Sequence, residues 1–207
     1  MNNLIKRILS SIILLPLSFY FLLHGSFMLI FFITTCFVVA CYEWHMMAKK
    51  KSYKIYGLIF LIFSFFTFYE LSIDLEWGLF FVILICISTD IGGYIFGKIF
   101  KGPKLTKISP NKTYAGVIGG YFLSLICLTM ITNLINYPGT PTQYFITTIL
   151  ISTVSQIGDI IISYFKRLSK IKNTGNIIPG HGGLLDRIDG MIFAFPILYL
   201  VELTGYL

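Results

Sequence analysis

The sequence contains few charged residues, and this shortage restricts the kind of protein that it can form. Asp, Glu, Lys and Arg make up 12% of its 207 residues and hydrophobic residues make up 56%, whereas soluble globular domains carry about 25% charged residues. The mean hydropathy is strongly positive. The composition therefore excludes an ordinary soluble domain and predicts an integral membrane protein.

Cysteine is also scarce, and its placement excludes two kinds of site. The four cysteines lie within apolar stretches and show no CxxC spacing, so neither a zinc site nor a disulfide framework is indicated. The first apolar stretch lacks a small-x-small cleavage site before the next one begins, in HGSFML at 24–29. We therefore expect the N-terminal segment, which contains Pro16, to be an uncleaved helix.

Long apolar runs, by contrast, are abundant. A membrane-spanning helix needs about 20 predominantly apolar residues, and stretches close to that length recur along the whole chain. We expect seven spans, at residues 8–23, 26–47, 55–72, 77–97, 114–134, 144–165 and 190–206. The predicted fold is an all-α, polytopic transmembrane helical bundle.

The basic residues test this arrangement independently, because cytoplasmic loops of membrane proteins carry an excess of Lys and Arg. All 16 of these residues lie on one side of the membrane if the seven spans alternate. We predict a cytoplasmic N-terminus and a C-terminus outside. The net charge of +7 follows from this bias alone or reflects attraction to anionic lipid and phosphate. Nucleic acid is not an expected partner.

Acidic residues are rarer still, nine in all, yet several fall within the predicted spans. An ionisable side chain costs roughly 2.5 to 3.5 kcal/mol at the centre of a membrane helix, which makes each one a functional candidate. The candidates are Glu43, Asp90, Asp159, Asp186 and Asp189.

Helix geometry predicts that four of these acids share a site. Asp90 and Asp159 each precede a cytoplasmic helix end by about two turns, and Asp186 and Asp189 lie one turn apart. We expect the four to converge in a pocket open to the cytoplasm, where Mg²⁺ would offset their mutual repulsion. The alternative is that they pair with neighbouring cations and only tie helices together.

Glycine and lysine mark further candidate regions. Gly93 and Gly97, and again Gly116 and Gly120, show the spacing that lets membrane helices approach closely; the alternative is that glycines beside Asp90 leave room for a ligand. The two longest cytoplasmic loops mix Lys with Gly, Ser, Thr and Asn, a composition that can cradle phosphate. Walker A spacing is absent.

Residues 163–190, SYFKRLSKIKNTGNIIPGHGGLLDRIDG, resemble the signature of the phosphatidate cytidylyltransferase (CDP-diacylglycerol synthase) family. The upstream blocks STDIGGYIFGKIFKGPKL, ISPNKTYAGVIGG and SQIGDIIISYFKR extend the resemblance to about residues 85–207. We accordingly divide the chain into N-terminal transmembrane helices, 1–80, and a catalytic transmembrane region, 81–207. Two positions depart from the family pattern: Asn173 stands where an Asp is usual, and Ala115 where many relatives have an acid.

The resemblance implies the reaction of CTP with phosphatidic acid to give CDP-diacylglycerol and pyrophosphate, for phospholipid biosynthesis in a bacterial inner membrane. It implies Mg²⁺, with Mn²⁺ as a substitute and K⁺ as a further cation, and a homodimer as one assembly. The implied catalytic residues are Asp159, Lys166, Arg167, His181, Asp186, Arg187 and Asp189. The implied substrate-binding residues are Asp90, Ser109, Lys112, Thr113, Ser163, Lys172, Gly182 and Gly183. The implied metal ligands are Asp159, Asp186 and Asp189.

Two other functions compete with this interpretation. An ion-coupled transporter would also place acids beside glycine-rich helices, but its site would lie near the bilayer midplane between inverted repeats, whereas these acids lie toward the cytoplasmic end and no internal repeat is visible. A CTP-dependent polyprenol kinase would share the nucleotide and the membrane setting, but it would release CDP instead of pyrophosphate.

Overall fold

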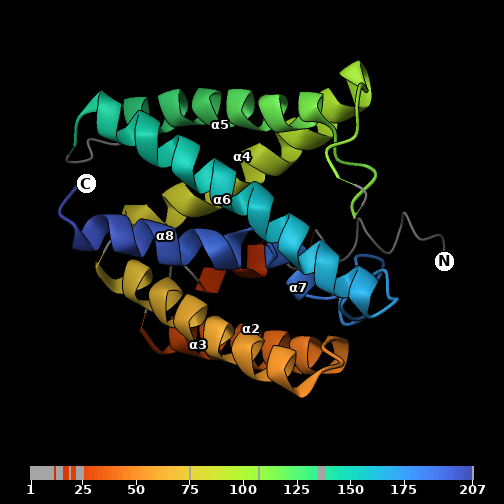
Figure 1. Cartoon of the computed structure of the whole chain (residues 1–207). Helices are drawn as coiled ribbons and strands as arrows, with labels where there is room; N and C mark the ends of the chain where they lie inside the picture. Colours follow the sequence, from red (N-terminus) through yellow and green to blue (C-terminus); the bar gives the residue numbers. More distant parts are fainter. Residues whose placement is uncertain are drawn as a thin grey trace. The chain divides into compact units, whose positions relative to one another are not determined.

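The computed structural model describes residues 12, 16–18, 20–21, 26–74, 76–106, 108–134 and 139–206, and its regular structure there is helical throughout (Figure 1). Only two isolated β-bridges occur in this part of the chain. The helices are α2 (Ser26–Met47), α3 (Lys51–Asp74), α4 (Glu76–Phe100), α5 (Tyr114–Leu134), α6 (Pro141–Leu168), α7 (Leu185–Ile188) and α8 (Met191–Leu203). The all-α prediction is confirmed for the described residues.

Five of these helices are long and apolar enough to cross a membrane, namely α2 to α6. They correspond to the predicted spans from 26–47 to 144–165, and α3 is longer than the predicted 55–72. The predicted span 190–206 forms α8, whose 13 residues cover about 20 Å, less than the ~30 Å hydrocarbon core. The predicted span 8–23 lies largely outside the described residues.

Local sequence sets the start of α6. Thr140 lies just before the helix and accepts a hydrogen bond on Oγ1 from the backbone N–H of Gln143, at 3.3 Å. The Gln143 Oε1 in turn accepts from the N–H of Thr140, at 2.6 Å. This is a capping box, and Pro141 occupies the first helical position, where its missing N–H costs nothing. The PGTPTQ sequence is therefore a helix start signal.

The chain divides into two compact units, and each is described by itself. The first consists of Met1–Tyr69 and Phe165–Ile188, and the second of Glu70–Tyr164 and Asp189–Leu207. The unit boundaries differ from the division at residue 80, which concerned where the catalytic residues lie and stays a prediction.

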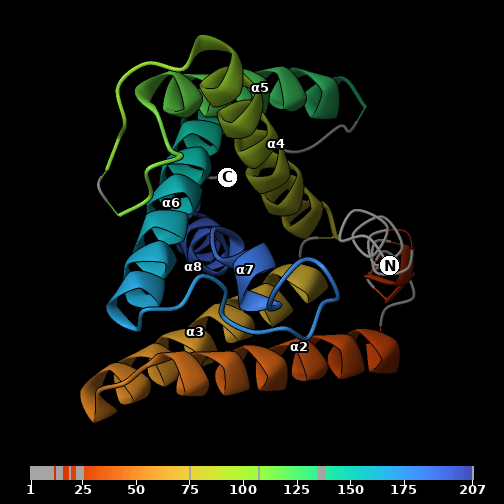
Figure 2. The ribbon, with the colours of Figure 1, turned by 90° about the vertical axis from the view of Figure 1, so that its right-hand side faces the viewer.

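In the first unit, α2 and α3 run side by side as an antiparallel pair (Figures 1 and 2). Trp44 joins them, because its Nε1 donates to the carbonyl of Tyr53 at 3.1 Å and its ring occupies the space where Gly57 has no Cβ. The Trp44 ring also lies 5.0 Å from that of Phe165, at the end of α6. An aromatic contact thus packs the last turn of α6 against the pair.

In the second unit, α4 packs along α5 through glycine. A Cβ on Gly116 would lie 2.8 Å from the carbonyl oxygen of Gly93, and one on Gly92 would overlap the carbonyl of Gly119. The close approach predicted from the glycine spacing is confirmed, and α5 fills the space beside Gly92. Polar contacts add α6 to the pair: Thr89 Oγ1 donates to Ser152 Oγ at 2.9 Å, and the Tyr121 and Thr153 hydroxyls lie 2.8 Å apart.

Candidate functional site

The signature loop between α6 and α7, residues 169–184, is shaped by a tight turn. Ile178 donates its N–H to the carbonyl of Gly182 at 2.9 Å and accepts from the N–H of His181 at 3.0 Å. Gly180 and Gly182 have φ values of 79° and 93°, in the left-handed region that side chains with a Cβ rarely adopt. The PGHG sequence therefore provides the glycines that this turn requires.

Asp186, on α7, is enclosed by donors of the same unit. Lys166 Nζ lies 2.8 Å from Oδ1, while the backbone N–H groups of Thr174 and Gly183 donate to Oδ2 at 2.8 and 3.0 Å. The Lys166 and Asp186 side chains are only 11% and 8% exposed. Burial raises the pKa of Asp186, but Lys166 and the two N–H groups outweigh burial and leave that pKa below its ordinary value.

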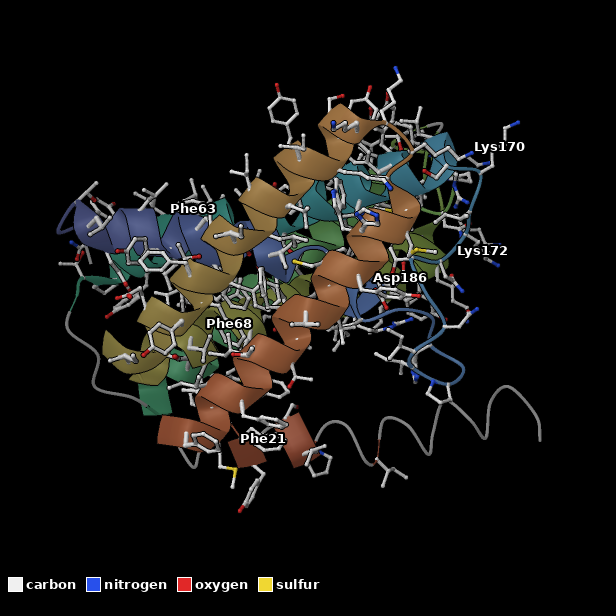
Figure 3. All side chains as sticks on the ribbon, turned by 90° about the horizontal axis from the view of Figure 1, so that it is seen from below. Phe21, Phe63, Phe68, Lys170, Lys172 and Asp186 are labelled. Carbon is white, nitrogen blue, oxygen red and sulfur yellow. The ribbon has the colours of Figure 1, made fainter. Side chains whose placement is uncertain are left out.

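Four other cations in or beside the signature loop are exposed, namely Arg167, Lys170, Lys172 and Arg187. Arg167 Nη1 donates to the carbonyl of Ile171 at 3.4 Å, and Arg187 Nη2 donates to the carbonyl of His181 at 2.6 Å. Lys172 projects from the outer side of the loop, as does its neighbour Lys170, whereas Asp186 lies inside (Figure 3). The loop thus presents positive charge to solvent around a buried carboxylate.

Asp159, on α6, belongs to the second unit and has a different environment. Lys112 Nζ lies 2.5 Å from its Oδ2, and the two side chains are 23% and 28% exposed. Lys112 Nζ also donates to the carbonyl of Gln156 at 3.3 Å, and Ser163 Oγ donates to Asp159 Oδ1 at 3.4 Å. These contacts leave the ion pair accessible to a charged ligand.

Lys112 is positioned by the loop between α4 and α5. Its N–H donates to the carbonyl of Ser109 at 3.0 Å, and its carbonyl accepts from the N–H of Leu105 at 2.8 Å. The next residue, Thr113, caps α5, because its Oγ1 accepts from the N–H of Gly116 at 3.1 Å. Ser109 and Thr113 therefore have structural contacts of their own, and their predicted roles in substrate binding stay predictions.

Asp189 opens the last segment of the second unit, where α6 and the start of α8 meet. Its Oδ1 accepts from the N–H of Gly190 at 3.0 Å, and a Cβ on Gly158 would lie 3.0 Å from its carbonyl oxygen. Gly158, the neighbour of Asp159 in the sequence, is therefore packed against Asp189. Asp90 is exposed on α4.

The structure thus sorts the predicted site residues into two groups. The first unit places Lys166, Asp186, Gly183, His181 and Arg187 in the signature loop or in the helix ends beside it. The second brings together Lys112, Asp159 and Ser163. Within the described residues, no three His, Cys, Asp or Glu side chains form a group that could hold a metal ion.

The sequence prediction omitted one residue from the site, Glu43. It was noted as an acid within a span, but the signature motif begins 120 residues further along the sequence. The structure places its carboxylate against the signature loop, where Thr174 Oγ1 and the N–H groups of Leu184 and Leu185 donate to it at 2.8 to 2.9 Å. The sequence signal that could have identified Glu43 as a site residue is its position as an isolated acid in an otherwise apolar helix.

Comparison with known proteins gives the family. A family model described as "Cytidylyltransferase family" matches residues 72–204, which include the signature loop and both aspartate–lysine pairs. The chain belongs to the cytidylyltransferase family. Among its relatives, a protein of Rickettsia felis named phosphatidate cytidylyltransferase is 36% identical, and the alignment covers 98% of this chain and 93% of that protein.

Longer relatives of the same name match a smaller share of their length. The one from Brucella suis is 34% identical over 82% of this chain and 63% of its own. The one from Bacillus subtilis is 38% identical over 61% of this chain and 48% of its own. The chain therefore spans less than two thirds of the length of these two cytidylyltransferases.

The two departures from the family pattern lie in different settings. Asn173 is exposed, and its Cγ would be 3.2 Å from a Cβ placed on Gly182, so the side chain packs on the turn of the signature loop. Ala115 is half-buried in the first turn of α5. Asn173 directly precedes Thr174, whose N–H donates to Asp186 Oδ2 at 2.8 Å.

Proposed function

We propose that this cytidylyltransferase family member is a phosphatidate cytidylyltransferase, which makes CDP-diacylglycerol and pyrophosphate from CTP and phosphatidic acid. The observation that carries the proposal is the 36% identity over 98% of the chain with a protein of that name. The exposed cations of the signature loop support it, because both substrates are polyanions.

The reaction is a nucleotidyl transfer. A phosphate oxygen of phosphatidic acid attacks the α-phosphorus of CTP, a new P–O–P bond forms, and the bond to the β-phosphate breaks as pyrophosphate leaves with the electron pair. The nucleophile is already ionised at neutral pH, so no side chain has to remove a proton from it. Catalysis then depends on positioning and on stabilising negative charge.

The proposed roles follow from the contacts of each residue. Arg167, Lys172 and Arg187 are exposed and would bind phosphate oxygens, for which arginine offers bidentate geometry. Lys112 is accessible beside Asp159 and would orient a phosphate of the nucleotide. His181 lies in the glycine turn, where it would contact phosphate.

Mg²⁺ fits the donor set of the second unit. Magnesium is usually held by one or two carboxylates together with substrate phosphates, and Asp159 offers a carboxylate that is 28% exposed, on the helix that meets the start of α8 at Asp189. When bound, the ion would neutralise charge on the triphosphate. The oxygens of Asp186 already accept three hydrogen bonds, so its place among the ligands stays a prediction.

The membrane arrangement is part of the proposal. The long apolar helices make this a membrane protein; we propose seven spans in a bacterial inner membrane, with the N-terminus and all Lys and Arg on the cytoplasmic side, where CTP is found. A cysteine at position 50 or 104 should then react with an impermeant reagent only from the cytoplasmic side, and one at position 140 only from outside. Labelling of positions 104 and 140 from the same face would contradict this topology.

A product assay tests the activity. The purified protein in detergent micelles should release pyrophosphate only when CTP, phosphatidic acid and Mg²⁺ or Mn²⁺ are all present, and excess EDTA should stop it. Release of CDP in its place would identify a lipid kinase. Size measurement in the same detergent distinguishes a monomer from the homodimer that the family resemblance suggests.

A further inference from the structure

Glu43 is a buried carboxylate near the end of a membrane helix. It lies one turn before the end of α2, and only 1% of its surface is exposed. A carboxylate taken out of water requires hydrogen-bond donors. Among the described residues, the donors to the Glu43 carboxylate are Thr174, Leu184 and Leu185, which lie more than 120 residues away in the sequence.

Three donors from the signature loop and the start of α7 contact this carboxylate. Leu184 N–H donates to Oε1 at 2.9 Å, and Leu185 N–H donates to Oε2 at 2.8 Å. Thr174 Oγ1 donates to Oε2 at 2.9 Å. Glu43 therefore binds the loop at two places, its middle and its end, and joins them to α2.

These contacts are coupled to Asp186 through shared residues. Thr174 donates its hydroxyl to Glu43 and its backbone N–H to Asp186 Oδ2, at 2.8 Å. Leu184 and Leu185 directly precede Asp186, so their N–H groups fix the orientation of the peptides from which Asp186 and Arg187 extend. Glu43 and Asp186 therefore both accept hydrogen bonds from the backbone of the same segment.

The loop glycines are explained by the same contacts. A Cβ on Gly175 would lie 2.7 Å from Glu43 Oε1, and one on Gly183 would overlap both carboxylate oxygens of Glu43. Only glycine lets the loop backbone come this close. Gly183, expected from the sequence to bind substrate, therefore has a role in the approach of the loop to Glu43.

We propose that Glu43 is a positioning residue for the cytidylyltransferase reaction: it anchors the signature loop in the conformation that presents Asp186 and Arg187. The inference rests on the proposed function and deepens it. It adds a residue outside the stretch that the family model matches, 72–204. Glu43 acts through the loop and touches no substrate.

Glu43→Gln tests whether Glu43 anchors the loop, by a measurement that does not depend on enzyme activity. The amide keeps the size of the side chain but turns an NH2 group toward at least one N–H or O–H donor. Hydrogen–deuterium exchange of the detergent-solubilised protein should become roughly tenfold faster or more at residues 184 and 185. Glu70→Gln is the matched control, because Glu70 is a half-buried glutamate of α3 that belongs to the second unit; it should leave exchange at residues 184 and 185 unchanged. Unchanged exchange in Glu43→Gln would overturn the anchor.

Kinetics test whether the anchor serves catalysis. Misplacement by about 1 Å commonly costs on the order of 100-fold in rate, so Glu43→Gln should lower kcat roughly 10- to 100-fold and leave KM for CTP within about threefold. A raised KM with an unchanged kcat would overturn the positioning role in favour of substrate binding.

Thr174 provides a second pair of variants in case Glu43→Gln does not fold. Thr174→Val removes only the hydroxyl donor and should lower kcat, while Thr174→Ser keeps the donor and should restore it; equal activity of the two overturns the proposal. If the wild-type protein makes no CDP-diacylglycerol, the proposed function fails and the catalytic role fails with it. The exchange result would still report on the anchor by itself.

Discussion

Two aspartates of this protein each pair with a lysine, and their surroundings differ. Asp186 and Lys166 are about 10% exposed, and Asp186 accepts two further N–H groups. Asp159 and Lys112 are about a quarter exposed, and a serine hydroxyl at 3.4 Å is the further contact of Asp159. A buried pair whose oxygens are all used holds its loop in place, whereas an open pair can exchange partners with a ligand.

The aspartates of the two pairs therefore have different roles. Backbone N–H groups in and next to the signature loop donate to two carboxylates: those of Thr174 and Gly183 donate to Asp186, and those of Leu184 and Leu185 donate to Glu43 on α2. The loop between α4 and α5 instead delivers a single lysine to an aspartate on α6. We therefore expect changes at Asp186 to affect both stability and turnover, and changes at Asp159 to affect turnover alone.

Asp186→Asn should have the largest effect. The amide places an NH2 group against either Lys166 or two N–H donors, and breaking a buried ion pair costs about 3 to 5 kcal/mol. We expect turnover to fall below detection and the unfolding temperature in detergent to drop by several degrees. Pyrophosphate release and thermal unfolding measure the two effects.

The double variant Lys166→Met with Asp186→Asn is the control for the Asp186 prediction. It removes the unpaired buried ammonium, so it should recover part of the lost stability but none of the activity. Wild-type turnover in Asp186→Asn would contradict the assignment of Asp186 to the site.

Asp159→Asn should separate activity from stability. The pair with Lys112 is partly exposed, and such pairs contribute about 1 kcal/mol or less, so the unfolding temperature should change by no more than a few degrees. Turnover should fall about 100-fold, because an amide cannot supply the charge that holds a cation among phosphates. A Mg²⁺ titration of the remaining activity should show a higher requirement for the ion. A large loss of stability with normal turnover would reverse the comparison between the two pairs.

Acid should weaken the first unit through Asp186. Its pKa in the folded protein lies below its ordinary value, which is about 3.9 in the unfolded chain. A group with a depressed folded pKa contributes stability that is present above its unfolded pKa and lost as pH falls through the folded pKa. The stability difference between wild type and Asp186→Asn should therefore be constant from pH 7 to about 5 and shrink below pH 4. Denaturant unfolding across this range is the measurement, and a difference that grows below pH 4 would contradict it.

The sequence predicted the helices more fully than the site. Apolar length alone located α2 to α6, and glycine spacing predicted the contact of α4 with α5, because both depend on local composition and period. The signature loop was found as a motif, but its internal contacts depend on where α2 lies. A carboxylate at position 43 and N–H groups at positions 184 and 185 meet only in the folded chain, and no local pattern predicts such a contact.

The shortness of α8 could not be predicted either. The run MIFAFPILYLVEL is apolar throughout, and hydropathy extends it to a span of about 17 residues, 190–206. In the structure the helix begins at Met191, directly after Gly190 packs on Ser155, and ends at Leu203. The packing of Gly190 therefore sets the start of α8, and Thr204–Gly205 sets its end. Composition alone does not show either limit.

Asn173→Asp should have the smallest effect. The side chain is exposed and lies against the turn at Gly182, and its oxygen can accept a hydrogen bond as an amide or as a carboxylate. Because Asp186 is held by Lys166, Thr174 and Gly183 and not by residue 173, restoring the usual family residue should change kcat by less than about threefold. Steady-state assays of the two proteins at saturating CTP make the comparison, with Lys172→Ala as a control that removes a neighbouring exposed charge predicted to bind substrate. An increase of orders of magnitude in Asn173→Asp would mean that this loop, anchored as it is by Glu43, still lacks a carboxylate that the reaction needs.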